Sequence, residues 1–188
     1  MGYSTKKQGG ILQMSGEDGR KLRNDKKVDV KATISETFKK QLYFFAELCN
    51  EPVKEVAERF CILGLVEPSV IDEICKWLRR DYRYGTAIAI GHMERPKLKL
   101  KSKGETGKVS MRFNQKAYDK LTQLAYALDI TPSSTASVLI RVASKDTAFM
   151  EKFIYDLDRV DEEQREMVKE FAKEAWGIRF KKEEYNGV

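Results

Sequence analysis

Residues 30–48, VKATISETFKKQLYFFAEL, and residues 109–128, VSMRFNQKAYDKLTQLAYAL, show the same order of patterns. Each stretch begins with alternating apolar and polar residues, which is typical of a strand with one buried face. A capping residue follows, Ser35 in the first stretch and Asn114 in the second, and its side-chain oxygen can accept a backbone N–H. Apolar residues then recur at helical spacing. The sequence therefore predicts a short strand followed by an amphipathic helix, and it predicts this twice.

The two stretches are part of a longer duplication with an offset of 79 residues. A second helix is predicted after each first helix, and in the second copy Thr131 and Pro132 give it an N-cap and a proline at the first helical position. A third apolar block repeats as well, with Val70, Ile71, Ile74 and Leu78 matching Phe149, Met150, Phe153 and Leu157. Few residues are identical, so the duplication is inferred from element order, spacing and apolar phase together.

Composition limits the classes of function. The 188 residues carry a net charge of +6, which favours a polyanionic partner such as nucleic acid, although an ordinary basic protein would have the same charge. Cys49, Cys61 and Cys75 form no CxxC pair and lie in apolar patterns, so we expect reduced core thiols in a cytoplasmic protein. No apolar run reaches the roughly 18 residues of a membrane helix, and we expect no membrane partner.

Motifs for catalysis or metal binding are missing from the sequence. There is no HExxH, no Cys/His cluster with zinc spacing, no phosphate-binding loop and no GxGxxG. The single histidine, His92, lies in a predicted loop. We therefore expect a protein that is not an enzyme and that uses no cofactor and no metal.

The repeated unit resembles the ribbon-helix-helix (MetJ/Arc) superfamily. The residues that carry the resemblance are the two stretches quoted above, together with LDITPSSTASVLIRVA at 128–143, which is similar to the second half of the motif. The resemblance implies a fold that is mainly α with short β-ribbons and consists of two tandem ribbon-helix-helix units plus additional helices. It also implies that paired strands enter the DNA major groove.

A single unit has too few residues for an independent core, and its strand leaves unpaired backbone groups. Pairing two units removes both problems. The pairing could take place inside one chain, since residues 81–106 are long enough to connect the units, or between two chains in a homodimer or higher oligomer. Conjugation accessory proteins with two such units per chain resemble this arrangement.

The expected organisation has five parts. A flexible basic arm covers 1–27, the first unit with its extra helix covers 28–80, a linker with a basic stretch covers 81–106, the second unit covers 107–159, and an acidic C-terminal helix and tail cover 160–188. The C-terminal helix is expected to cap the core, and the alternatives are that it mediates oligomerisation or partner binding.

Side chains that point away from the core of each strand are free to contact bases. In the first copy these are Lys31 and Thr33, and in the second copy they are Ser110 and Arg112. Arg112 could donate to guanine O6 and N7, which is worth about 1–3 kcal/mol of discrimination. Asp29 and Lys108 lie at the ends of the ribbon and are weaker candidates. A solvated strand face is the alternative.

Backbone phosphates have two candidate sites. The resemblance implies a phosphate clamp at the start of the second helix, where Thr131, Ser133 and Ser134 add hydroxyls to free N–H groups. The same region of the first copy carries Glu51 and Glu55, which disfavour a phosphate, so the two copies are chemically unequal. The basic stretch RPKLKLKSK at 95–103 contributes Lys97, Lys99 and Lys101, unless it is only a solvated linker.

Two further segments, at the end of the first unit and in the linker, point to a function less clearly. Trp77, Tyr82, Tyr84 and their neighbouring arginines resemble the aromatic and basic mixture of nucleic-acid surfaces, but such clusters more often pack a helix end. The apolar run 86–90 is expected to be a buried strand or turn.

These observations predict a sequence-specific protein that binds double-stranded DNA, either a transcriptional regulator (repressor) or a plasmid or phage control protein. One alternative is an architectural DNA-binding protein in plasmid partition or conjugative DNA processing. A further alternative is a protein-interaction module that has lost DNA recognition.

Overall fold

The computed structural model describes residues 27–100 and 104–180, and within these ranges the protein is mainly helical with two small antiparallel sheets. This confirms the predicted fold class at the level of a helical protein with a short ribbon. The elements, in chain order, are β1 (Val28–Ser35), α1 (Glu36–Leu48), α2 (Val53–Gly64), α3 (Pro68–Cys75), β2 (Tyr82–Tyr84), β3 (Ala87–Ala89), β4 (Thr106–Phe113), α4 (Gln115–Leu128), α5 (Pro132–Ala143), α6 (Thr147–Tyr155) and α7 (Glu162–Trp176).

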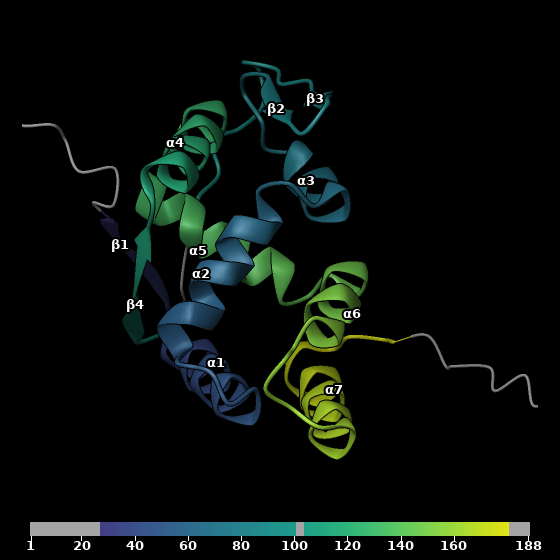
Figure 1. Cartoon of the computed structure of the whole chain (residues 1–188). Helices are drawn as coiled ribbons and strands as arrows, with labels where there is room; N and C mark the ends of the chain where they lie inside the picture. Colours follow the sequence, from purple (N-terminus) through teal and green to yellow (C-terminus); the bar gives the residue numbers. More distant parts are fainter. Residues whose placement is uncertain (1–26, 101–103, 181–188) are drawn as a thin grey trace, which may run out of the picture.

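The ribbon formed by β1 and β4 joins the two copies within one chain (Figure 1). The strands are antiparallel, and the register runs from Val28 opposite Phe113 to Ser35 opposite Thr106. Lys31 lies opposite Ser110 near the centre of the ribbon, and these two residues are themselves related by the offset of 79. The pairing is therefore symmetric about the duplication, and each strand lies beside its own counterpart.

Helix boundaries follow the same offset. Helices α4, α5 and α6 each begin 79 residues after α1, α2 and α3, respectively. The predicted caps are present, since Ser35 Oγ accepts the N–H of Phe38 at 3.3 Å and Asn114 Oδ1 accepts the N–H of Ala117 at 2.8 Å. The turn after the first helix of each copy holds a left-handed residue at the corresponding position, Asn50 with φ 53° and Asp129 with φ 59°. Both residue types tolerate this conformation.

The core lies between the inner face of the ribbon and the crossed helices α2 and α5 (Figure 1). The alternating apolar residues of both strands are buried there: Val30, Ala32, Ile34, Val109, Met111 and Phe113. The helices approach closely where Gly64 faces α5, since a Cβ at Gly64 would lie 3.4 Å from Leu139 Cδ2. Each large buried side chain stabilises the fold by roughly 1.5–3 kcal/mol.

Helix α5 also satisfies the outer edge of β1. The backbone N–H of Thr33 donates to Ser137 Oγ at 3.0 Å, and this hydroxyl in turn donates to the carbonyl of Ser133 at 3.0 Å. The bond is partly buried, and a backbone N–H without a partner there would cost free energy. The hydrogen bond therefore fixes the first turns of α5 beside the ribbon.

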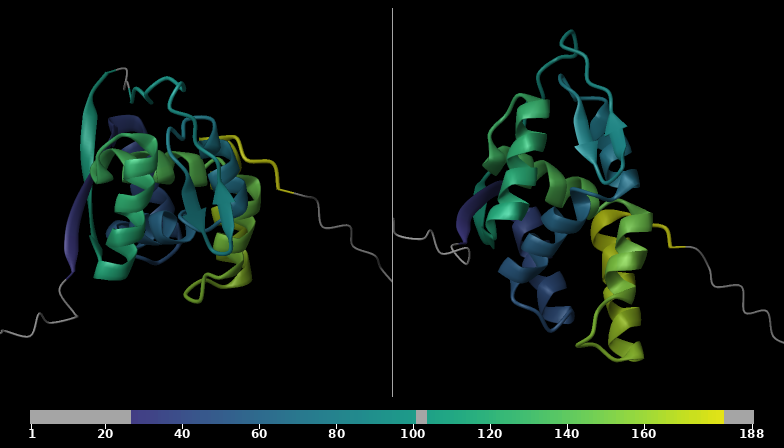
Figure 2. Two further views of the ribbon diagram at one scale, coloured as in Figure 1. Left: turned by 90° about the horizontal axis from the view of Figure 1, so that it is seen from above. Right: turned by 45° about the horizontal axis from the view of Figure 1, so that its top comes forward.

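The elements outside the duplicated pattern make the molecule asymmetric. Helix α7 packs on α1, where the rings of Phe45 and Trp176 lie 4.8 Å apart and Gln41 Nε2 donates to the carbonyl of Ala175 at 3.2 Å. On the other copy, the β2–β3 hairpin follows α3 and contacts α4. In every view of Figures 1 and 2, α6 and α7 lie on the side of the molecule away from the ribbon.

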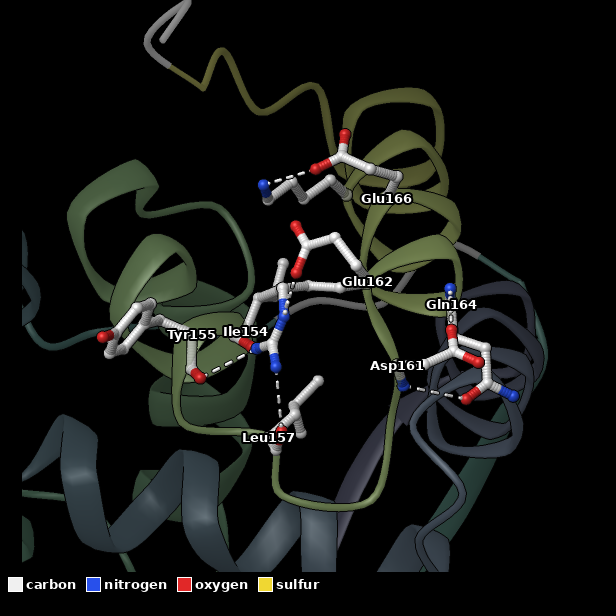
Figure 3. A network of polar contacts seen from close by, with 9 residues as sticks. Ile154, Tyr155, Leu157, Asp161, Glu162, Gln164 and Glu166 are labelled. Atoms are coloured by element: carbon white, nitrogen blue, oxygen red, sulfur yellow. Dashed lines mark hydrogen bonds and ion pairs between the residues drawn. The ribbon is translucent and has the colours of Figure 1, made fainter.

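Arg165 of α7 joins α6 and α7 through the carbonyls of Ile154, Tyr155 and Leu157, which are labelled in Figure 3. Its guanidinium donates to the carbonyls of Ile154, Tyr155 and Leu157, at 2.8 Å to Tyr155 and 3.2 Å to Leu157. These carbonyls belong to the last turn of α6 and the residues just after it, where a cation is favoured by the helix dipole. The start of α7 is closed by a capping box between Asp161 and Gln164. The helix predicted from residue 160 onward is thus present, and it covers part of the core.

The structure of residues 77–90 differs in part from what the sequence predicted. The run 86–90 forms a hairpin strand, but it is mostly not buried: Ile88 and Ile90 are 49% and 57% exposed because the two-stranded hairpin is covered on one side only. Tyr82, in contrast, is buried and donates its hydroxyl to the carbonyl of Leu65 at 3.0 Å, and burial raises its pKa. Tyr82 is therefore a packing residue.

Candidate nucleic-acid interface

The outer face of the β1–β4 ribbon is polar and exposed. Every second residue of each strand points outward. These side chains are Asp29, Lys31 and Thr33 of β1 and Lys108, Ser110 and Arg112 of β4. The strand alternation that buries Ala32 and Met111 turns these residues to solvent. All four residues predicted to contact bases, Lys31, Thr33, Ser110 and Arg112, lie on this one face, as the alternation predicted.

Arg112 has a partner that the sequence did not predict. Its Nε lies 2.9 Å from Asp29 Oδ1, because the register places the two residues directly opposite each other. Both side chains are exposed, 66% for Arg112 and 62% for Asp29, so water screens the pair. The guanidinium can therefore exchange Asp29 for another acceptor at little cost. The face carries three cations, Lys31, Lys108 and Arg112, against one carboxylate.

The start of α5 lies beside this face. Thr131 is the N-cap: its Oγ1 accepts the N–H of Ser134 at 3.2 Å and donates its hydroxyl to Ser134 Oγ at 3.0 Å. Ser133 is exposed in the first turn. Ser137, which accepts the N–H of Thr33, follows Ser133 by about one helical turn, so the first turn of α5 lies next to the residue that contacts the edge of β1. The hydroxyls and N–H groups predicted for a phosphate clamp are therefore close to the predicted base-contact face.

Three cations gather immediately before this turn, around Asp129. Its carboxylate lies 2.7 Å from Lys97 Nζ, 3.6 Å from Arg80 and 3.8 Å from Arg79. The hydrogen bond from Lys97 is the main cause that holds the pKa of Asp129 below its ordinary value. Three positive charges against one negative charge leave an excess of positive charge two residues from Thr131.

The corresponding region of the first copy is different. Helix α2 begins at Val53 after Pro52, which gives no side-chain cap. Glu51, just before it, pairs with Arg59 at 2.6 Å, and Glu55 is exposed in the first turn. Carboxylates at this helix start disfavour a phosphate there, so the chemical inequality predicted from the sequence is present in the structure.

The basic stretch is described only in part. Residues 95–100 have no regular secondary structure, as the proline and alternating lysines predict, and Lys99 is exposed. Lys97 is held against Asp129 but remains 61% exposed. Lys101, together with 1–26 of the predicted basic arm, lies outside the described residues.

Arg79 and Arg80 were predicted only as part of an aromatic and basic cluster, and their position at the end of α4, next to Asp129, was not predicted. The N–H groups of both residues donate to the carbonyl of Ala127, at 2.8 and 3.1 Å, and Arg80 also lies 4.3 Å over the ring of Tyr126. No local pattern connects Arg80 with Asp129, because the two residues are far apart along the chain. The acidic residue at the left-handed turn position was the one available clue.

In the described ranges, no group of three or more His, Cys, Asp or Glu side chains is arranged to hold a metal ion. Likewise, no helix in that part of the chain has the length and apolar character to cross a membrane. Comparison of the chain with families of known proteins, with curated proteins and with solved structures gave no match.

Proposed function

We propose that this chain is a sequence-specific double-stranded DNA-binding protein in which two tandem ribbon-helix-helix units pair within one chain, and that it acts as a transcriptional regulator or as a plasmid or phage control protein. The observation that carries the proposal is the β1–β4 ribbon. One of its faces is buried under α2 and α5, and the other presents Lys31, Thr33, Ser110 and Arg112 to solvent.

The ribbon has the dimensions and chemistry of a major-groove element. A two-stranded ribbon fits the groove, which is about 12 Å wide, and its outward side chains then face base edges. Lysine and arginine recognise guanine, while threonine and serine hydroxyls accept or donate to either base of a pair. The outer-face cations Lys31, Lys108 and Arg112 add attraction to the phosphates.

The start of α5 supplies a second contact in this proposal. Exposed Ser133 and the N–H groups of the first turn would bind a phosphate beside the groove, assisted by Arg80 and Lys97 around Asp129. The acidic start of α2 gives no equivalent clamp. The protein would therefore bind DNA in one orientation, at a site whose two halves differ.

Selection of binding sites from random duplexes tests the proposal. We expect enrichment of a short asymmetric sequence and an affinity that falls steeply with salt, with a log–log slope of about −0.9 per phosphate contacted. Arg112→Ala should relax specificity at one position of the enriched site. Lys97→Ala with Lys99→Ala should weaken binding equally on all sequences.

Two other outcomes of the selection experiment would support the alternative functions. Salt-dependent binding with no enriched sequence would favour an architectural role, because backbone contacts alone carry no sequence information. No enriched sequence together with a salt slope near zero would exclude DNA binding and leave a protein-interaction module.

A further inference from the structure

A shallow apolar groove of about 610 Å³ lies between α1 and α7. Its floor is formed by Phe44 and Leu48 of α1 and by Met167 and Phe171 of α7. Phe44 is 49% exposed and Met167 is 52% exposed, although the rings of Phe44 and Phe171 lie 5.0 Å apart. Large exposed apolar side chains that gather in one place mark interaction surfaces more often than isolated ones do.

The second copy of the duplication shows that the fold does not need an aromatic residue here. The position of Phe44 is occupied by Gln123 in α4, and the position of its neighbour Tyr43 is occupied by Thr122. Both copies form the same helix with the same buried face. The exposed aromatic residue of α1 is therefore additional to what the helix requires.

One side of the groove is acidic. Glu163, Glu166, Glu170 and Glu174 follow one face of α7, and all four are exposed. The flanking cations on α7 are Lys169 and Lys173, which lie 2.6 Å from Glu166 and Glu170, respectively. Four carboxylates against two ammonium groups leave the rim with an excess of negative charge.

We propose that this groove binds a basic amphipathic segment of a partner protein. The apolar side of the segment would cover Phe44, Met167 and Phe171, and its lysines or arginines would face the glutamates of α7. Helix-in-groove recognition uses this combination of apolar anchors and flanking charge. A symmetric dimer through the same surface is disfavoured, because it would bring the two acidic rims together.

The location suits a partner that binds at the same time as DNA. Helix α7 lies on the side of the molecule away from the β1–β4 ribbon (Figures 1 and 2). Binding at this groove does not require DNA, so the test is made without DNA and can fail or succeed independently of the proposed function.

The test uses the full chain and a displayed library of random 16-residue peptides. Peptides are selected on the wild-type protein and depleted on the Phe44→Gln variant, which carries the residue found at the equivalent position of α4. We expect winners with a net positive charge and apolar residues at helical spacing. A synthesised winner should bind Phe44→Gln about tenfold more weakly, as loss of an aromatic anchor does. Glu163→Gln with Glu174→Gln should weaken binding several-fold and reduce its salt dependence.

Tyr43→Thr is the matched control, since it removes a neighbouring exposed aromatic residue that does not line the groove. It should leave peptide affinity unchanged, and circular dichroism should show the same helicity for all variants. The proposal is overturned if no peptide is enriched, if winners lack positive charge, or if they bind Phe44→Gln as tightly as wild type. Sedimentation that shows a wild-type dimer abolished by Phe44→Gln would overturn it too, because the occupant would then be a second copy.

Discussion

At the scale of single residues, the ribbon face combines cations with one carboxylate. Asp29 lies opposite Arg112 because of the register, and the two exposed side chains form an ion pair. Such pairs contribute about 0–1 kcal/mol to stability. Asp29 therefore contributes little to the stability of the fold. Its main effect is to occupy the Arg112 guanidinium, which would otherwise be available to a ligand.

Asp29→Asn is expected to strengthen DNA binding several-fold while changing the free energy of unfolding by less than about 0.5 kcal/mol. The substitution removes a negative charge next to the phosphates and releases the Arg112 guanidinium. Fluorescence anisotropy on the selected duplex measures the affinity, and urea denaturation measures the stability. Unchanged or weaker binding by Asp29→Asn would show that Arg112 does not contact DNA from this position.

Cysteine reactivity tests the packing of the core. Burial raises the pKa of Cys49 to about 12 and raises that of Cys61 as well, whereas Cys75 is only half-buried and its pKa is raised mainly by partial desolvation. Because the thiolate is the reactive form, a raised pKa slows the reaction at pH 8. We expect a chromogenic disulfide reagent to modify one thiol of the native protein and three in denaturant.

The pH dependence of that reaction has a definite sign. Raising the pH from 7 to 9 should accelerate modification of Cys75 by increasing its thiolate fraction, while Cys49 and Cys61 react only when the protein unfolds. Cys75→Ser should leave no rapidly reacting thiol in the native protein. Rapid reaction of two or three native thiols would show that the core is open.

At the scale of elements, the starts of α2 and α5 are equivalent positions with opposite chemistry. Glu55 and Ser134 are related by the offset of 79. Ser134→Glu should lower DNA affinity about tenfold or more, since a carboxylate would enter the proposed phosphate clamp, while the helix dipole keeps α5 stable. Glu55→Ser should raise affinity. Equal affinities for both variants and wild type would place the phosphate contacts elsewhere.

Substitution of Arg165 tests the contact between α6 and α7. Arg165→Gln should lower the free energy of unfolding by about 1–3 kcal/mol, because the carbonyls at the end of α6 lose a charged donor. Urea denaturation followed by circular dichroism measures the loss. Arg83→Gln, at an exposed position of β2, is the control and should cost less than about 0.5 kcal/mol. An equal effect of both variants would contradict the assigned role of Arg165.

At the scale of the whole molecule, both strands of the ribbon come from one chain. Folding is therefore unimolecular, and the urea midpoint should not change when protein concentration is varied about 100-fold. A dimer that exchanges strands between chains would be stabilised by concentration through mass action. A midpoint that rises with concentration would thus contradict the intrachain ribbon.

Much of the fold could be predicted because it follows from patterns of neighbouring residues. Alternation identified β1 and β4, and capping by Ser35 and Asn114 marked where α1 and α4 begin. The outward residues Lys31 and Arg112 followed from the same alternation. The ion pair of Arg112 with Asp29 could not be predicted, because it depends on the register between two strands 70 residues apart in the chain.

The burial of the hairpin at 82–89 could not be predicted either, because it also depends on contacts between distant segments. Its apolar residues predicted burial, but Ile88 is exposed because the hairpin has a neighbour on one side only. Likewise, the approach of Arg80 and Lys97 to Asp129 depends on how that hairpin and the following segment pass over α4.

Patterns of neighbouring residues were sufficient to predict the repeated order of strand and helices, the buried face of each, and the chemical difference between the starts of α2 and α5. These properties depend on spacing and residue type within about 20 neighbouring residues, where backbone geometry alone sets which side chains share a face. The pairing of the two strands within one chain and the acidic groove between α7 and α1 become visible only in the folded protein. Both depend on contacts between distant segments. The burial of apolar surface favours these contacts, but no pattern of neighbouring residues indicates which segments meet.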